Sequence, residues 1–217
     1  MGRKKTMQIN ADLTQPVIVH ADRIDWVPSP AKGVDRKMLY REGDEVARAT
    51  SIVRYAKGSA FPEHTHTGGE EILVLDGTFQ DEHADYPAGT YFRNPPGTAH
   101  SPAAKDGCVI FVRLWQFRTG DTAQIVRDPA DAQGVLFDDG HESVSRETLS
   151  GQIFRANPRG LELLVISGHL HLATETLGPW DWLRLPAGQA LEARAEAACV
   201  WIKDAPLQHP DVLKMPE

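Results

Sequence analysis

The second half of this chain repeats the first half at a fixed offset of 91 residues, which limits the available folds more than any other feature. Without a gap, Gly69–Gly77 aligns with Gly160–Gly168. Matches at glycine and proline carry the most weight, because these residues set the backbone geometry. Further pairs at the same offset are Arg93 and Arg184, Pro95 and Pro186, Gly97 and Gly188, and Cys108 and Cys199. We therefore predict the duplication of one structural unit.

Each copy consists of short apolar or alternating runs separated by glycine and proline, a pattern typical of strands joined by turns. No long amphipathic helix is evident, so the pattern favours an all-β barrel or sandwich. Residues 118–122 and 128–131 are polar and turn-rich, which indicates a connection between the copies. We expect a first domain over residues 1–125 and a second over residues 126–217. The clearest predicted strands are Ala49–Tyr55, Glu71–Leu75, Gly89–Arg93 and Val109–Trp115.

Three histidines and one glutamate in the first copy form the strongest candidate site. His64 and His66 are two residues apart, so on a strand both imidazoles face the same side. Glu70 follows a pair of glycines, and His100 comes about thirty residues later, behind a Pro-Pro-Gly turn. Three imidazoles and one carboxylate form a suitable ligand set for a divalent transition metal.

The repeat distinguishes these four residues from those that the fold itself requires. The turn residues persist in the second copy, but all four candidate ligands are absent together. At the offset of the repeat, His64 corresponds to Arg155, His66 to Asn157, Glu70 to Leu161 and His100 to Leu191. We predict that the first copy binds the metal and that the second is a degenerate copy without ligands.

Other histidines are predicted to lie outside a metal site. The segment from His169 to Glu175 has the same His-x-His-x-x-x-Glu spacing, but it starts directly after the turn residue Gly168. No histidine follows at the position that corresponds to His100, so we interpret the segment as polar strand residues. His83 lies among the acidic residues 81–85, and we predict that it is part of a solvated hairpin tip. No constellation of ligands surrounds His20, His141 or His209 in the sequence.

Two further residues near the site are predicted not to be ligands, Glu71 being either a structural residue or a partner of the ligands and Arg93 a structural residue. Glu71 follows Glu70 directly, so on a strand it faces the opposite side. Arg93 is matched by Arg184 in the copy without ligands, which favours a structural ion pair over a role in the site.

Charge and composition argue against several partners. The net charge of −7 over 217 residues disfavours nucleic acid and acidic membranes, which require a basic face. We interpret the only basic run, Arg3–Lys5, as a solvated terminus. No apolar run approaches the roughly 20 residues of a membrane span, and no signal peptide is visible, so we expect a cytoplasmic protein. Cys108 and Cys199 each precede an apolar run and are predicted to be buried free thiols on strands.

The spacing of the candidate ligands matches the two motifs of the cupin superfamily. The first, G(x)5HxH(x)3E(x)6G, is met by Gly58, His64, His66, Glu70 and Gly77. The second, G(x)5PxG(x)2H(x)3N, is met by Gly89, Pro95, Gly97 and His100, with Ala104 in place of the final asparagine. Residues 68–77, 85–89 and 93–97 resemble the ChrR-type cupins. The resemblance covers residues 25–120 well, and residues 145–205 are similar to a degenerate second cupin.

This resemblance implies two cupin barrels in tandem, each a double-stranded β-helix or jelly roll, with the metal held by His64, His66, Glu70 and His100. ChrR-type proteins are anti-sigma factors whose cupin-like domain binds zinc and helps to sense singlet oxygen. This implies a zinc-binding regulator that responds to stress or to a ligand. In that family a helical N-terminal domain with its own His/Cys zinc site binds the sigma factor. The first 25 residues of this chain contain no cysteine, so direct sigma binding is not expected.

The resemblance also leaves an enzyme open. Related cupins include mononuclear dioxygenases that cleave ketones or diketones, so the alternative is an iron dioxygenase that acts on a small carbonyl compound. Manganese and nickel suit the same ligand set. No acid/base pair stands out, so no catalytic residue is assigned. A small ligand in the first barrel and a homodimer are further expectations.

Overall fold

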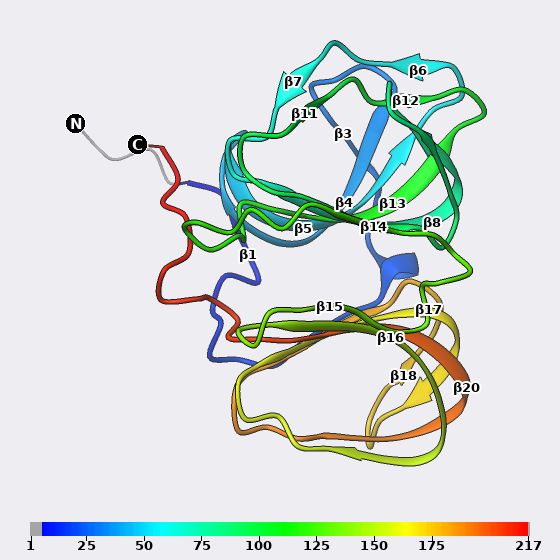
Figure 1. Cartoon of the computed structure of the whole chain (residues 1–217). Coiled ribbons are helices and arrows are strands. Elements are labelled where there is room, and N and C mark those ends of the chain that lie inside the picture. The colour runs from blue at the N-terminus through cyan, green and yellow to red at the C-terminus, as the bar shows by residue number, and fades with distance from the viewer. Residues whose placement is uncertain (1–5, 217) are drawn as a thin grey trace. The chain divides into compact units, whose positions relative to one another are not determined.

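The computed structural model describes residues 6–216, and its regular elements are strands apart from one 3-10 turn, η1 (Ala21–Arg23) (Figure 1). The predicted all-β fold of two cupin barrels is confirmed. None of the helical segments in the described range is long and apolar enough to span a membrane. The basic run Arg3–Lys5 lies outside the described residues.

The first compact unit holds Trp26–Asp131 and the described parts of both chain ends, up to Ala11 and from Pro210. Its strands are β1 (Gln8–Ile9), β3 (Val27–Pro28), β4 (Val34–Gly43), β5 (Ala47–Tyr55), β6 (Ser59–Ala60), β7 (His64–Thr65), β8 (Glu70–Gln80), β9 (Asp85–Pro87), β10 (Tyr91–Asn94), β11 (Ala99–His100), β12 (Ala103–Ala104), β13 (Cys108–Leu114) and β14 (Ile125–Arg127). The main sheet has the antiparallel order β1-β4-β5-β13-β8-β10-β14, with β3, β6, β9 and β12 at its margins. The strands β7 and β11 form a separate ladder.

The apolar core of this unit lies on one face of the sheet. Residues two apart on a strand share a face, and β13 accordingly contributes Cys108, Ile110 and Val112 to the same cluster. These side chains pack with Val53 of β5 and Ile72 of β8. Burial of this kind contributes roughly 1.5–3 kcal/mol for each large apolar side chain. The sheet therefore presents one continuous apolar wall to the interior of the first barrel.

The opposite face of the sheet carries a buried polar network. The Glu71 carboxylate accepts hydrogen bonds from the Tyr91 hydroxyl at 2.6 Å and from Arg113 at 2.7 Å. Arg93 forms an ion pair of 2.7 Å with Asp121. These contacts confirm the structural role predicted for Arg93 and, of the two alternatives for Glu71, the structural one.

The second compact unit holds Asp12–Asp25 and Ala132–His209. Its strands are β2 (Val17–Val19), β15 (Gly134–Asp138), β16 (Ser143–Arg155), β17 (Leu161–His171), β18 (Thr176–Leu177), β19 (Trp182–Leu185) and β20 (Leu191–Asp204). The sheet order is β15-β16-β20-β17-β19-β2, with β18 paired to β17.

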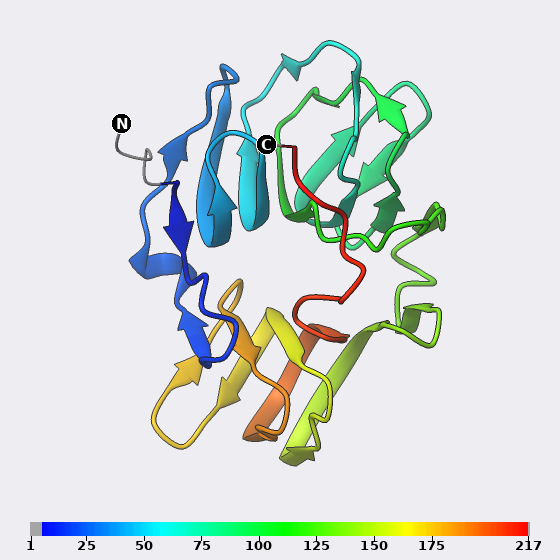
Figure 2. The same cartoon turned by 90° about the vertical axis from the view of Figure 1, so that its left-hand side faces the viewer.

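The two units differ from the halves 1–125 and 126–217 that the sequence suggested. The strand β2 pairs with β19, which takes residues 12–25 into the second unit (Figure 2). The strand β14 pairs with β10, which keeps the polar segment after residue 118 in the first unit. Both differences arise because the outer strands of each sheet find partners far away in the sequence.

The internal repeat has a counterpart in the backbone geometry. The bounds of β17 and β19 are those of β8 and β10 moved by 91 residues. The N–H of Gly97 donates to the carbonyl of His66 at 2.9 Å, and the N–H of Gly188 donates to Asn157 at 2.7 Å. Gly77 lies in the left-handed region, with φ of 70°, and a Cβ there would lie 2.3 Å from a backbone oxygen of Gly107. The aligned glycines therefore mark equivalent turns.

Both cysteines are free thiols on strands, as predicted. Cys108 is buried, and this burial raises the pKa of its thiol to about 12. Cys199 is only half-buried, so the prediction of a buried thiol is wrong at this position.

Candidate metal centre

Two antiparallel ladders bring the four predicted ligands together. In the first, β7 pairs with β11 so that His64 lies opposite His100. His66 extends this ladder, because its N–H donates to the carbonyl of Thr98 at 2.8 Å. In the second, Glu70 at the start of β8 lies opposite Asn94 at the end of β10. Residues far apart in the sequence meet here because the segment before β8 runs beside the segment after β10.

The ligand atoms are close enough to surround one cation. One ring nitrogen each of His64, His66 and His100 lies within 4.8 Å of the others. The Oε1 atom of Glu70 lies 3.4 Å from Nε2 of His66 and 3.3 Å from Nε2 of His100. His66, Glu70 and His100 are buried, and His64 is exposed. The structure thus gathers all four residues, with one histidine open to the outside.

The chemistry of this donor set fits a divalent transition metal. Burial, reinforced by His100 and His64, lowers the pKa of His66 to about 3, so its imidazole is neutral and offers a lone pair. Burial also lowers the pKa of His100, although Asp81 opposes this shift. Burial raises the pKa of Glu70 to about 7, partly offset by a hydrogen bond from Asn94. Nε2 of His66 is buried and makes no hydrogen bond, even to nearby Glu70. A metal ion would supply its missing partner.

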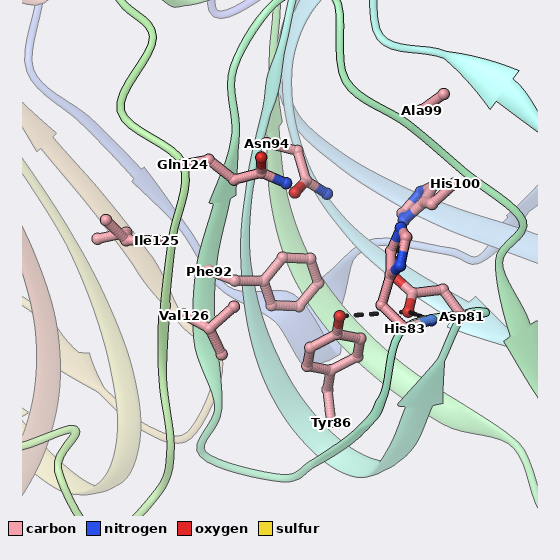
Figure 3. A pocket seen from close by; sticks show the side chains of 10 residues that line it. All are labelled: Asp81, His83, Tyr86, Phe92, Asn94, Ala99, His100, Gln124, Ile125 and Val126. Atoms are coloured by element: carbon pink, nitrogen blue, oxygen red, sulfur yellow. Dashed lines mark hydrogen bonds and ion pairs between the residues drawn. The ribbon is translucent and has the colours of Figure 1, made fainter.

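Two further side chains, Asp81 and Asn94, hold the ligands in place. Nδ1 of His100 lies 3.2 Å from Oδ2 of Asp81, and the amide of Asn94 donates to Oε1 of Glu70 at 2.9 Å. Oδ1 of Asp81 accepts a hydrogen bond from the Tyr86 hydroxyl at 3.2 Å (Figure 3). Such partners fix the orientation of a ligating side chain. His83 is exposed, as predicted for a hairpin tip, but the side chain of Asp81 in the same hairpin is only 3% exposed, because its carboxylate turns inward to His100.

The repeat contains a signal that could have identified Asp81 and Asn94 as partners of the metal ligands. At the offset of 91 residues, Asn94 corresponds to Leu185, and Leu185 lies opposite Leu161 as Asn94 lies opposite Glu70. In the same way Asp81 corresponds to Leu172, which packs against the core that contains Leu191. In the second copy, both members of each polar pair are leucine, so the pairs can be found by comparing the copies.

We predict that Asp81→Ala weakens metal binding by about 10- to 100-fold. Without the Asp81 carboxylate, the imidazole ring of His100 is no longer held in the orientation that binds the metal. The measurement is a competition titration against a chromophoric chelator. Asp85→Ala is the matched control, since Asp85 is an exposed carboxylate of the same hairpin. Equal affinities of the two variants would contradict the positioning role of Asp81.

The segment from His169 to Glu175 in the second unit, which has the same His-x-His-x-x-x-Glu spacing as the candidate site, does not bring its three side chains together. His171 contacts the Thr176 hydroxyl at 3.1 Å, and Glu175 instead lies 3.2 Å from His20. Over the range that the structure describes, His169, His171 and Glu175 form no three-ligand cluster.

The expectation that no constellation of ligand-type groups surrounds His20 is wrong, whereas His209 has one carboxylate partner and belongs to no such cluster among the described residues. Nδ1 of His20 lies 2.8 Å from Asp181, and these two with Asp22 form a second compact group of ligand-type side chains. Nε2 of His209 lies 3.1 Å from Glu142. Pairing between distant segments of the chain creates both contacts, which is why local sequence did not reveal them.

A cavity of about 620 Å³ adjoins the candidate metal centre. His64, His66 and Glu70 lie on its wall, and the remainder of the wall is mostly apolar. The apolar side chains include Val34, Val53, Phe61, Ile110, Val112 and Leu114. A smaller pocket of about 220 Å³ reaches His100 beside Asp81 and Asn94 (Figure 3). The ligands thus border a space large enough for a small molecule.

Comparison with known proteins finds one similar family and several similar folds. The ChrR Cupin-like domain family matches residues 14–118. No curated protein matches the sequence. Bacterial pirin YhhW from Escherichia coli, solved in complex with nickel(II), is 17% identical with a TM-score of 0.67, over 88% of this chain and 99% of that one.

Two other solved structures agree in fold. A Nostoc punctiforme protein proposed to be a dioxygenase is 14% identical with a TM-score of 0.69, over 94% of this chain and 88% of that one. The protein Ylba from Escherichia coli is 12% identical with a TM-score of 0.68, over 93% of each chain. These likenesses show that the chain has a cupin-type fold of paired barrels, and residues 14–118 are similar to the ChrR Cupin-like domain family.

Proposed function

We propose that the first barrel binds one divalent transition metal ion through His64, His66, Glu70 and His100, and acts on a small carbonyl compound beside it as a mononuclear oxygenase. The observation that carries this proposal is the cavity of about 620 Å³, because three of the four ligands lie on its wall. Its size is within the usual range for small-molecule sites. A purely structural metal site is closed by its ligands, whereas a catalytic one keeps an open position. A cavity beside the ligands supports the open form.

The residues of the chain have distinct roles in this proposal. A bound divalent ion would polarise a carbonyl oxygen or lower the pKa of a bound water. Asp81 holds the ring of His100, and Asn94 holds the carboxylate of Glu70. Burial raises the pKa of Tyr55 above its usual range, so the hydroxyl stays protonated and can donate a hydrogen bond. Apolar residues such as Val53 and Ile110 line the cavity and exclude water from the substrate.

A second candidate is a non-catalytic regulator that senses an oxidant or a small ligand, with zinc as its metal. The match of residues 14–118 to the ChrR Cupin-like domain family favours it. In both candidates the net charge of −7 supports a protein without nucleic-acid or acidic-membrane partners. We place it in the cytoplasm, as a monomer or homodimer.

Anaerobic purification followed by elemental analysis and oxygen-uptake assays tests the two candidates. For the oxygenase we expect about one iron ion per chain and oxygen uptake that depends on a diketone such as acetylacetone. Manganese or nickel with such uptake would retain the enzyme and change its metal. Full occupancy by zinc, with no uptake even after replacement by iron, would favour the regulator. A chain that binds none of these ions would contradict both.

A further inference from the structure

Arg36 places an unpaired cation on the wall of the metal cavity. It lies on β4 two residues after Val34, and both residues line the cavity. Val34 belongs to the apolar core, and Val53, opposite Arg36 on β5, does too. The neighbours of Arg36 on this face of the sheet are apolar, and its side chain lies on the wall of the cavity that His64, His66 and Glu70 also border.

The contacts of Arg36 differ from those of other arginines in this unit. No ion pair holds the Arg36 side chain among residues 6–216, and its buried Nε atom has no hydrogen-bond partner; the Nε atom of Arg48 is in the same state, but Arg48 forms an ion pair with Glu42. On the neighbouring strand, Arg54 forms an ion pair of 2.7 Å with Asp35. Arg93 and Arg113 each pair with a carboxylate on the opposite face of the sheet. A buried donor without a partner is costly, so the geometry of Arg36 favours an acceptor that comes from a ligand.

We propose that Arg36 binds the carboxylate of the molecule that occupies this cavity, so that the ligand is a small monocarboxylate with an apolar body and a carbonyl group. A guanidinium fits a carboxylate with two parallel hydrogen bonds. The acidic residues Glu45 and Glu63 also line the cavity, and both are exposed. Their charges disfavour a ligand with several negative groups, whereas a single carboxylate is matched by the single guanidinium. This inference rests on the proposed function, because the carbonyl group is assigned to the metal.

Calorimetric titration of the metal-loaded protein with benzoylpropionate and with its uncharged primary amide tests the assignment. The two probes share the phenyl ketone and differ only in the charged group. We expect the wild-type protein to prefer the carboxylate by about 10- to 100-fold, the range of a hydrogen-bonded charge. Arg36→Gln should remove the preference without weakening the amide, and Arg36→Lys should retain part of it.

Arg54→Gln is the matched control. It removes the same charge from the adjacent strand, but Arg54 pairs with Asp35 and does not line the cavity. A preference that survives in Arg36→Gln, or that falls equally in Arg54→Gln, would overturn the proposal, as would a wild-type protein that binds neither probe. Elemental analysis of the same samples tests the metal site separately from the role of Arg36. Loss of the preference in a protein that holds no metal would support the role of Arg36 and contradict the metal site. If Arg36→Gln fails to fold, the comparison of Arg36→Lys with the wild-type protein decides.

Discussion

His100→Ala is expected to abolish metal binding, whereas His169→Ala should leave it unchanged. His100 is 2% exposed and lies 3.3 Å from Glu70 and beside His64 on the paired strand. Its removal deletes one of the four metal ligands, and alanine offers no replacement. The loss of metal affinity should therefore exceed the roughly 100-fold effect expected when a hydrogen-bond partner of a ligand, such as Asp81, is removed. His169 has the same local motif, but within residues 6–216 it belongs to no cluster of three ligand-type side chains. Metal content after dialysis, measured by elemental analysis, gives the result.

The paired design distinguishes the two His-x-His segments directly. Circular dichroism of both variants shows whether the β fold is retained, so that loss of metal is separated from unfolding. Equal loss of metal in both variants, or retention in His100→Ala, would show that the ligands were assigned to the wrong residues.

Gly68→Ala is expected to destabilise the protein by about 2–3 kcal/mol, the cost of overpacking a well-packed site. A Cβ at Gly68 would lie 2.0 Å from Cδ2 of Trp115. Cγ and Cε2 of the same indole would lie 2.3 and 2.4 Å from this Cβ, so the rigid ring would have to move as a whole. Gly68 also lies between His66 and Glu70, so the displacement should weaken metal binding too. Urea denaturation of the metal-free protein measures the free energy of unfolding.

Gly178→Ala provides the matched control for this prediction. Neither glycine has a positive φ, and the nearest atom to a Cβ at Gly178 is 3.7 Å away, in ordinary contact. Such a change is expected to be neutral or to stabilise by about 0.4–1 kcal/mol through the unfolded chain. A Gly68→Ala variant as stable as Gly178→Ala would contradict the close packing of Trp115 on the backbone.

The sequence predicted the strands of the repeat well, because glycine turns and alternating apolar residues are local signals. Residues 109–115 were expected as a strand, and β13 covers Cys108–Leu114. The four candidate ligands were also recognisable, since their spacing places them at the ends of strands that pair. The duplication helped further, because a copy in which Leu161 and Leu191 replace Glu70 and His100 shows which positions the fold itself does not require.

The remaining features depended on contacts between distant segments. Asp81 was grouped with exposed acidic neighbours, and only the pairing of the strands around it shows that it faces His100. His20 acquires its carboxylate partners because β2 lies against β19. Arg36 is one of many arginines in the sequence, and its lack of a partner can be recognised only once the positions of all nearby carboxylates are known.

The pairing of β2 with β19 has a consequence for biosynthesis. The ribosome releases Val17–Val19 early, yet the partner strand Trp182–Leu185 is made only near the end of translation. Domains usually fold in the order in which they emerge, but here the second barrel must wait for its last strands while one of its own edges is already outside the exit tunnel. A gene fragment that starts after residue 131 would encode this barrel without that edge, so truncation experiments should retain residues 12–25.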